Sequence, residues 1–357
     1  MTILSGTEFN EKYSNTEFYK VLHHDGIHFG FKYQHGLNVD HLPFNPSGMC
    51  SVGGLYFAEV DKLSYWIGTN SVYIAKVTIP SNASVCVEKD KFKADQFVLD
   101  LDNKVLITDF CMWENEAFCK ISVRHDWCTL QYVRNQSDEI CKLAVRDDWC
   151  ALQYVRNQTD EICKIAVSNH GYGLEFVKVQ TNDICKIAVS KNGRALQYVI
   201  NQTDELCALA VSQNGYALEF VKDQTDEICK MALSKNGYGL EFIKVQTDEL
   251  CKLALSKNGR GLQYVINKTY ELCKLAVSQN GFALEFVKDQ TEELCTLAVS
   301  QTAHALKYVI NQTDEICKLA VSQNPFALEY VKVQTAELCQ LAVSHNDGDT
   351  FAFYIPT

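Results

Sequence analysis

Cysteine is the most regularly placed residue type in this chain, and its thiol is chemically reactive. Eleven of the 16 cysteines, from Cys119 to Cys339, stand 22 residues apart. Thiols in such a row could form a ladder of disulfides or metal sites. Neighbouring helices in a stack lie about 8–10 Å apart, however, and a disulfide needs Cα atoms within about 7 Å. Zinc sites usually use closer spacings, and no Cys-x-x-Cys pair occurs. We interpret the row as small apolar residues buried between helices in a reducing compartment, with the ladder as the alternative.

A second row of residues stands nine positions after these cysteines and varies more than its neighbours. Its members are Cys128, Cys150, Tyr172, Arg194, Tyr216, Tyr238, Arg260, Phe282, His304 and Phe326. Tyr, Arg and Phe are enriched at protein interfaces. Packing between neighbouring repeats is the more ordinary role for such side chains. The eight members from Tyr172 onward are the candidates for binding a protein partner.

Both rows are positioned by a repeat of 22 residues, a period that predicts a solenoid or an array. In the phrase that begins at Thr203, the threonine is an expected helix N-cap. Asp204 follows in the first turn, where the helix dipole favours negative charge. Leu206, Leu209 and Ala210 then fall on one apolar face. The pattern predicts a first helix over roughly 203–213.

The second half of the repeat predicts a tight turn and a shorter helix. Asn214-Gly215 is expected to end the first helix, because glycine adopts the left-handed conformation without steric cost. A second helix is expected from 216 to about 223. A β-strand is the alternative for Leu-Glu-Phe-Val, but the caps and the abundance of Ala and Leu favour helix. Since both helices are shorter than about 12–15 residues, they must be stabilised by stacking on neighbouring repeats.

Charged residues also recur at helical spacing. The first helix carries i, i+3 pairs such as Glu227 and Lys230, and the second carries pairs such as Glu219 and Lys222. Such pairs stabilise an isolated helix. Where isoleucine replaces the second lysine, as at Ile200, the acidic partner is lost as well. We predict that each pair lies within its own helix on a solvent-exposed face.

Residues 1–112 do not repeat, and they predict a compact α+β N-terminal domain. Short apolar runs between glycines and prolines indicate strands, and one helical turn is expected at 61–66. The expected strands lie near 19–24, 28–33, 54–57, 72–79 and 96–99. Residues 113–346 then predict an α-helical solenoid of about ten and a half helix-turn-helix repeats. The tail, 347–357, is expected to cover its open end as a cap.

Other chemistry is sparse. A net charge of −11 argues against an extended nucleic-acid surface. No apolar run predicts a membrane span, and the N-terminus lacks the features of a signal peptide. No P-loop or Gly-x-Ser-x-Gly motif occurs. Two clusters could hold a metal, but a structural role is the more ordinary one, so we expect no metal and no cofactor. These clusters are His23-His24-Asp25 with His28, and Cys50 near His41.

The N-terminal sequence resembles the leader domain of repeat proteins from amoeba-infecting giant viruses of the mimivirus group. The resemblance rests on His28-Phe-Gly-Phe-Lys-Tyr and on Phe44-Asn-Pro-Ser-Gly-Met-Cys-Ser-Val-Gly-Gly-Leu-Tyr-Phe57. In those proteins the domain precedes ankyrin arrays, whereas the present repeats lack the ankyrin Thr-Pro-Leu-His phrase. The resemblance covers roughly the first third of the chain. It implies an intracellular viral product of the host cytoplasm or the virion, and it implies no activity.

A second resemblance concerns Gly54-Leu-Tyr-Phe-Ala-Glu with Ser64, which is similar to a segment of the poly-ADP-ribose polymerases. It implies that Tyr56 would stack on nicotinamide and that His23 or His24 would bind ribose. The place of that family's catalytic glutamate corresponds to Gln96, which supplies no negative charge. The resemblance therefore implies at most a remnant nucleotide pocket, formed by His23, His24, Tyr56, Ser64 and Gln96.

These observations lead us to expect a non-enzymatic scaffold that binds a host or viral protein through its solenoid surface. One alternative is a degenerate ADP-ribosyltransferase-like enzyme that uses the solenoid as a substrate adaptor. Another is a structural or self-assembling virion component, which leaves a homo-oligomer open. Nucleic acid and membrane are not among the expected partners.

Overall fold

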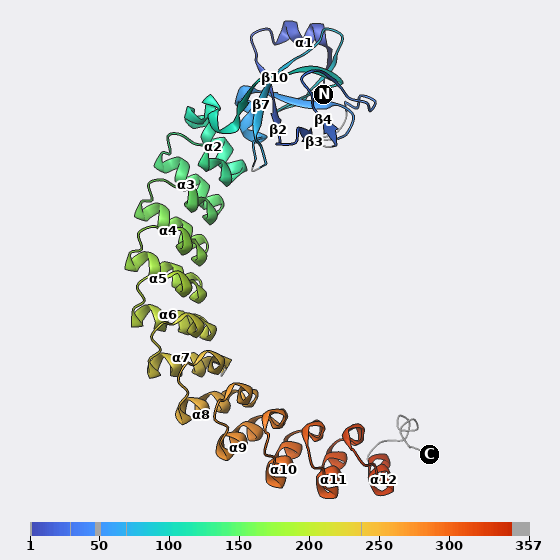
Figure 1. Cartoon of the computed structure of the whole chain (residues 1–357), viewed down its shortest axis with the longest axis vertical. Coiled ribbons are helices and arrows are strands. Elements are labelled where there is room, and N and C mark those ends of the chain that lie inside the picture. Colours follow the sequence, from blue (N-terminus) through green and yellow to red (C-terminus); the bar gives the residue numbers. More distant parts are fainter. Residues whose placement is uncertain (1, 29, 47–50, 69, 237, 345–357) are drawn as a thin grey trace. The chain divides into compact units, whose positions relative to one another are not determined.

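The computed structural model describes residues 2–28, 30–46, 51–68, 70–236 and 238–344, without the side chains of residues 235 and 236. By its internal contacts the chain divides into two compact units, Met1–Val179 and Gln180–Thr357. The first unit holds a β-sheet and the first repeats, and the second holds the later repeats (Figure 1). An antiparallel sheet followed by helical repeats confirms the predicted fold class.

The N-terminal strands form one antiparallel sheet in the order β1-β8-β9-β6-β2-β7-β10-β5, and β3 pairs with β4 in a separate hairpin. The strands are β1 (Thr2–Ser5), β2 (Phe18–Leu22), β3 (Ile27–His28), β4 (Phe31–Lys32), β5 (Gly36–Val39), β6 (Leu55–Glu59), β7 (Tyr73–Thr78), β8 (Ser84–Val87), β9 (Phe92–Ala94) and β10 (Gln96–Leu106). Four helices accompany them: α1 (Gly6–Lys12) and the 3₁₀ helices η1 (Val60–Tyr65), η2 (Ile107–Asp109) and η3 (Cys111–Glu114).

The expected strands are confirmed in β2, β6, β7 and β10, and the expected helical turn is confirmed in η1. The single strand predicted over 28–33 is wrong, because β3 and β4 fold back on each other there. Gly30 lies between them with a φ of 78°, a left-handed value that only glycine adopts at little cost. Helix α1 was not predicted. Its N-cap Ser5 and Glu8 form a capping box.

Phenylalanine rings form the core of the sheet domain. Phe9 of α1 is fully buried, and its ring centroid lies 5.0 Å from that of Phe18 and 5.2 Å from that of Phe92. Phe57 and Phe97 continue the cluster, with centroids 5.8 Å apart. Tilted and edge-to-face packing of this kind suits the ring quadrupoles. The domain therefore has its own core, as the sequence predicts.

Strands β2 and β6 pair over only two residues, Phe18 with Glu59 and Tyr19 with Ala58. Beyond that point β2 continues along β7 as far as Leu22, whereas the start of β6 pairs with β9. The two strands therefore diverge, and the sheet opens between them.

Each repeat consists of an α-helix followed by a 3₁₀ helix. The α-helices are α2 (Glu116–His125), α3 (Asp138–Asp147), α4 (Asp160–Asn169), α5 (Asn182–Lys191), α6 (Asp204–Gln213), α7 (Asp226–Asn236), α8 (Asp248–Lys257), α9 (Tyr270–Gln279), α10 (Glu292–Gln301), α11 (Asp314–Gln323) and α12 (Ala336–Ser344). The 3₁₀ helices are η4 (Trp127–Gln131), η5 (Trp149–Tyr154), η6 (Gly171–Phe176), η7 (Gly193–Tyr198), η8 (Gly215–Phe220), η9 (Tyr238–Phe242), η10 (Gly259–Tyr264), η11 (Gly281–Phe286), η12 (Ala303–Tyr308) and η13 (Pro325–Tyr330).

The first helix of the repeat follows the prediction closely. The hydroxyl of Thr203 accepts a hydrogen bond from the Leu206 N–H at 3.3 Å and so caps α6. Leu206 and Ala210 are buried as expected, and Leu209 is only half-buried. Cys207 is buried as well. The α-helices are about as long as predicted, with ten residues in α6.

The second helix is a 3₁₀ helix, which corrects the predicted α-helix. The Ala217 N–H donates to the Asn214 carbonyl at 2.8 Å, and the Val221 N–H donates to the Leu218 carbonyl at 3.2 Å. These i to i+3 bonds bring Leu218 and Val221 into line along the helix. Both side chains are buried. A short 3₁₀ helix of six residues that buries one apolar edge is sufficient here, because the neighbouring repeat covers that edge.

The predicted left-handed glycine at the turn is wrong. Asn214 is extended, with φ −148°, and its side chain caps η8 by accepting from the Tyr216 N–H. Among the described residues, the glycines with positive φ all lie in the N-terminal domain. The repeat glycine is needed for space, since a Cβ on Gly193 would lie 2.5 Å from the Ala210 carbonyl oxygen of the next repeat.

Glutamine joins successive repeats, in a role that the sequence did not reveal. Gln202 donates from Nε2 to the carbonyls of Leu196 at 3.2 Å and of Phe220 at 2.9 Å. Its Oε1 accepts the backbone N–H of Lys222, also in the next repeat, at 2.9 Å. Equivalent contacts to the following repeat are made by Gln136, Gln158, Gln180, Gln224, Gln246, Gln290 and Gln312. Each glutamine therefore fixes the spacing between one repeat and the next.

The charged pairs also cross between repeats, which corrects the pairing predicted within one helix. Lys230 contacts Glu249 of the next repeat at 3.0 Å and Asp226 of its own helix at 3.0 Å. Lys222 donates from Nζ to the Ile200 carbonyl of the preceding repeat at 2.9 Å. Because the α-helices of neighbouring repeats lie side by side, the first-turn acid of the next helix comes within reach.

The first repeats contact the sheet domain within the first unit. Helix α2 packs against η1, where the ring centroids of Tyr65 and His125 are 4.6 Å apart. Trp113 of η3 is fully buried and donates to the Ile107 carbonyl at 2.6 Å. The domain boundary near residue 112 remains a prediction, and the predicted cap, 347–357, lies outside the described residues.

Candidate functional site

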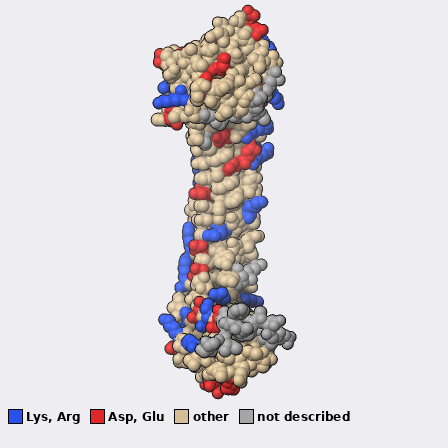
Figure 2. Space-filling view, turned by 90° about the vertical axis from the view of Figure 1, so that its right-hand side faces the viewer, with Lys and Arg blue, Asp and Glu red and all other residues tan. Residues whose placement is uncertain are grey.

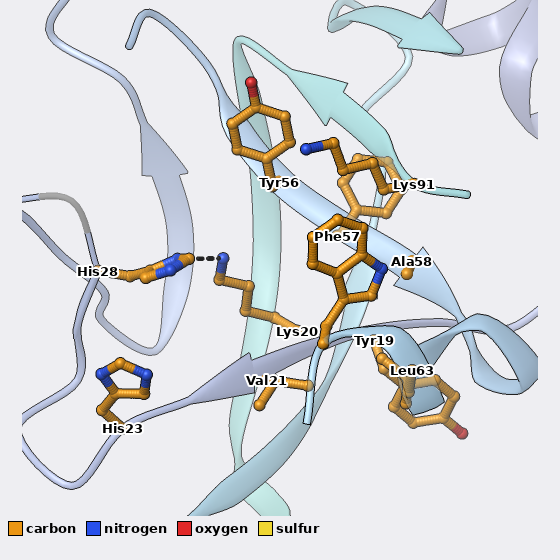
Figure 3. Close-up of a pocket in the computed structure, with 11 residues that line it drawn as sticks. Tyr19, Lys20, Val21, His23, His28, Tyr56, Phe57, Ala58, Leu63 and Lys91 are labelled. Atoms are coloured by element: carbon orange, nitrogen blue, oxygen red, sulfur yellow. Dashed lines mark hydrogen bonds between the residues drawn. The ribbon is translucent and has the colours of Figure 1, made fainter. Parts of the chain in front are cut away.

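The opening between β2 and β6 is a pocket of about 220 Å³. Lys20 and Val21 reach it from β2, whereas Tyr56 and Phe57 come from β6, as Figure 3 shows. Leu63 of η1 also lines it. One part of the wall is thus apolar, and the rest carries cationic and aromatic groups.

Lys20 is the first cation of this pocket. Its side chain lies on the sheet and is only 4% exposed. Its Nζ is 3.1 Å from His28 Nδ1 and 4.9 Å from the centre of the Tyr33 ring. Since an ammonium group only donates, Nδ1 accepts and the proton of a neutral His28 lies on Nε2. Burial, followed by the charge of Lys20, lowers the pKa of His28 to about 4.

Lys91 is the second cation, and it lies among aromatic rings. It is 6% exposed, and its Nζ is 4.2 Å from the centre of the Tyr56 ring and 4.7 Å from that of Trp66. Both distances are within the range of cation–π attraction. Its acidic contact is Glu88, at 3.7 Å. Trp66 joins the pocket although it is not in the sheet.

The structure brings together only part of the predicted nucleotide pocket. His23 and Tyr56 line the cavity, with the His23 and His28 ring centroids 5.6 Å apart. Ser64 is buried in η1, where its hydroxyl donates to the Asp61 carbonyl. His24 is exposed. Gln96 begins β10, and its side chain contacts the Asn82 carbonyl.

The sequence analysis missed the lysines. Lys20 and Lys91 stand 71 positions apart, and neither belongs to a motif. A weak signal was available, because Lys20 interrupts an apolar strand, Phe-Tyr-Lys-Val-Leu, at a position of the same parity as buried Phe18 and Leu22. Of the candidate metal residues, Cys50 lies outside the described part. Within the described part, no group of three His, Cys, Asp or Glu residues is placed to hold a metal ion.

The predicted binding row lies at the start of the 3₁₀ helices, and several of its members pack against the next repeat. Arg194 contacts Glu219 at 3.7 Å and lies 5.4 Å from the centre of the Phe220 ring. Tyr216 stacks on Tyr238, with centroids 6.4 Å apart. Similar cross-repeat contacts join Arg260 to Glu285, Phe282 to Tyr308 and His304 to Tyr330. The packing role that the sequence left open is therefore present.

The same row also reaches the surface. Tyr216 is 37% exposed, Tyr238 is 42% exposed and Phe326 is 57% exposed. The side chain of Arg194 is 48% exposed and that of Arg260 is 51% exposed. Tyr172, Phe282 and His304 are half-buried, Cys128 is buried and Cys150 is half-buried. Side chains held on one side by the next repeat thus remain accessible on the other.

A second exposed set was not predicted as a site. Large aliphatic residues follow the 3₁₀ helices and are 54–76% exposed. They are Val179, Ile200, Val245, Ile266, Ile310 and Val333. The isoleucines replace lysine at one position of the repeat, and the valines replace Asn or Asp at the next position. On the face drawn in Figure 2, positive and negative side chains are interspersed along the repeats.

The cysteine row is buried beside the glutamines that join the repeats. Cys207 Sγ lies 3.7 Å from Gln202 Oε1, and equivalent contacts are made by Cys141, Cys163, Cys185, Cys229, Cys251, Cys295 and Cys317. Burial raises the pKa of the Cys207 thiol, and it raises the pKa of Cys141 to about 11. All cysteines in the described part are free thiols. The row is a packing and hydrogen-bonding element of the repeat.

Among the described residues, none of the helices has the length and apolar character that a membrane-spanning helix needs. The chain is a helical-repeat protein that carries an N-terminal β-sheet domain with a cationic, aromatic pocket.

Comparison with known proteins confirms the resemblance to repeat proteins of mimivirus. The chain is 27% identical over 118 residues to an ankyrin repeat protein of Acanthamoeba polyphaga mimivirus, a match that covers 31% of this chain and 57% of that protein. It is 29% identical over 83 residues to a second ankyrin repeat protein of the same virus, covering 21% of this chain and 27% of the relative. The chain thus spans only part of the length of either relative. No protein-family model and no solved structure matches it.

Proposed function

We propose that the repeats form a scaffold that binds a protein partner, host or viral, in the cytoplasm of an infected amoeba or in the virion. The observation that carries the proposal is the row from Tyr172 to Phe326. Its aromatic and arginine side chains recur at a fixed spacing and keep 37–57% exposure at the members quoted above, and several of them also pack against the next repeat. Such residues are the common anchors of protein interfaces.

Preorganisation supports this role. Arg194 is held by Glu219 and by the Phe220 ring, and Tyr216 is held by the rings of Tyr238 and Phe242. Side chains that are already ordered lose less conformational entropy when a partner binds. Stacked repeats also offer extended surfaces. The printed names of the relatives, ankyrin repeat proteins of a giant virus, agree with a repeat scaffold of this kind.

The mixed surface charge favours protein over nucleic acid. The chain carries 44 acidic and 33 basic residues, and the face in Figure 2 shows both signs interspersed. A nucleic-acid surface would need a basic stripe.

Site-specific photo-crosslinking tests the proposal. A benzophenone amino acid is placed at Tyr216 or Tyr238 in the full chain, and at exposed Ser212 of α6 as the matched control. In extracts of infected amoebae, we expect one discrete protein adduct from the row positions and none from Ser212. Equal adducts from all three positions, or adducts from none, would contradict the proposal. An adduct with the mass of two copies of this chain would instead favour self-assembly.

A further inference from the structure

The pocket between β2 and β6 plays no part in the proposed scaffold, because its lining residues all belong to the N-terminal domain. It nevertheless holds two buried cations. Ammonium groups are costly to bury and are retained where an anionic or aromatic group compensates them. Lys20 comes from β2 and Lys91 comes from the segment just before β9. Two separate segments thus direct positive charge toward one cavity.

The charge balance of the lining is positive. Among the described residues that line the pocket, Lys20 and Lys91 are charged and no side chain is acidic. The acidic contact of Lys91, Glu88, is 7% exposed and lies outside the lining. The neighbouring His28 is neutral near pH 7, because burial and Lys20 lower its pKa to about 4. Lys91 is paired with Glu88, but the two lysines line a cavity whose described lining has no acidic side chain, so the cavity favours a ligand with negative charge.

The rest of the lining is aromatic and aliphatic. The Lys91 ammonium group lies 4.2 Å from the ring centre of Tyr56 and 4.7 Å from that of Trp66. Phe57, Ala58 and Leu63 provide an apolar wall. A site with an apolar wall and a few convergent polar groups binds a ligand that has the same two parts.

We propose that this pocket binds a small aromatic anion, with its ring among Tyr56, Trp66 and the apolar wall and its carboxylate or phosphate between Lys20 and Lys91. The cavity of about 220 Å³ suits one ring and one anionic group, because pockets for drug-sized ligands usually measure about 300–1,000 Å³.

Binding of defined probes to the full chain tests this assignment. The probes are benzoate, phenyl phosphate, the neutral isostere benzamide and inorganic phosphate, followed through the indole N–H signal of Trp66 in nuclear magnetic resonance spectra. The signal is assigned by its loss in Trp66→Phe. We expect benzoate or phenyl phosphate to shift it with a Kd at least tenfold lower than that of benzamide. Which of the two anions binds more tightly identifies the anionic group.

Variants then test the two cations. Lys20→Met and Lys91→Met keep the aliphatic stem and remove the charge, so each is expected to weaken binding of the better anion at least tenfold. Lys104→Met is the matched control, because Lys104 also lies over a tyrosine ring, at 4.5 Å from the centre of Tyr73, and does not line the pocket. The Kd of the Lys104→Met variant should stay within twofold of the Kd of the unmodified chain.

Several results would overturn the proposal. These are equal affinity for benzamide and benzoate, an equal shift with inorganic phosphate alone, no shift by either aromatic anion at millimolar concentration, or unchanged Kd in both folded lysine variants. Thermal unfolding of each variant shows whether it is folded. If a lysine variant does not fold, the comparison of benzoate with benzamide on the unmodified chain decides the question.

Discussion

The side-chain amide of Gln202 donates a hydrogen bond to the backbone carbonyl of Phe220, 2.9 Å away and 18 residues further along the chain. The same side chain accepts the N–H of Lys222 at 2.9 Å. One glutamine thus satisfies two backbone groups of the following repeat, at a point where regular secondary structure offers them no partner. This relationship recurs along the repeats and determines how they stack.

Gln202→Leu is predicted to destabilise the junction between α6 and α7 by about 2–3 kcal/mol, because two partly buried backbone groups lose their partners. Hydrogen exchange of the Lys222 amide measures this directly, and its protection should fall at least tenfold. The control is Gln213→Leu, at the exposed end of α6. Equal protection of Lys222 in both variants would show that the glutamine is not needed at the junction.

Lys268 occupies the glutamine position of its repeat and donates to the Val265 carbonyl at 2.9 Å. A lysine side chain has no acceptor, so it cannot receive the Lys288 N–H as glutamine would. Lys268→Gln is therefore expected to stabilise this junction by about 1 kcal/mol. Slower exchange of the Lys288 amide would confirm it. Faster exchange of the Lys288 amide in the Lys268→Gln variant would show that lysine stabilises this junction more than glutamine does.

Gly193→Ala is predicted to cost about 1–3 kcal/mol by overpacking, since its Cβ would lie 2.5 Å from the Ala210 carbonyl oxygen. Ala303 takes the equivalent place in a later repeat, so the expected result is a local shift rather than loss of the fold. Gly239→Ala is the control, because its Cβ would find its nearest neighbour at 3.5 Å. Urea denaturation should separate the two variants, and similar midpoints would contradict the steric explanation.

The thiols are expected to differ sharply in alkylation rate. Burial raises the pKa of Cys141 to about 11, so at pH 8 only about one Cys141 in a thousand is a thiolate, the reactive form. Cys111 is exposed. Brief treatment with iodoacetamide and peptide mass spectrometry should show Cys111 modified and Cys141 protected until denaturant is added. Comparable labelling of both in the native protein would exclude a buried row.

Stability is predicted to fall below pH 6.5 because of His28. Burial and the charge of Lys20 lower its folded pKa to about 4, below the unfolded value near 6.5. Between these values the unfolded chain binds more protons, so the free energy of unfolding rises with pH through that window and falls as the solution is acidified. After allowance for the half-exposed ring, the effect is about 1–2 kcal/mol.

Urea denaturation at pH 7 and pH 5 measures this loss of stability. His28→Asn retains an acceptor near the Nδ1 position and does not titrate, so it should show a smaller loss. His41→Gln, at an exposed position, provides the control. An unchanged pH dependence in His28→Asn would mean that other groups are responsible.

The sequence by itself determined the features that depend on near neighbours. The hydroxyl of Thr203 caps a helix by bonding an amide three positions away, and the 22-residue period requires that each unit adopt the same local structure. Short apolar runs between glycines and prolines predicted β2, β6 and β7 correctly, because strand formation also depends on neighbouring residues. The row from Tyr172 to Phe326 could be located in the sequence, although packing and binding could not be separated there.

Only the tertiary structure decided the contacts that join distant positions. Gln202 forms a hydrogen bond with Phe220, Lys230 forms an ion pair with Glu249, and Gly193 leaves space for the backbone of the next repeat. None of these follows from local spacing, because each depends on the register in which one repeat packs on another. The pocket has the same origin. Lys20 and Lys91 line one cavity only because β2 and β6 diverge after two paired residues, and strand pairing across such a distance is a property of the whole sheet.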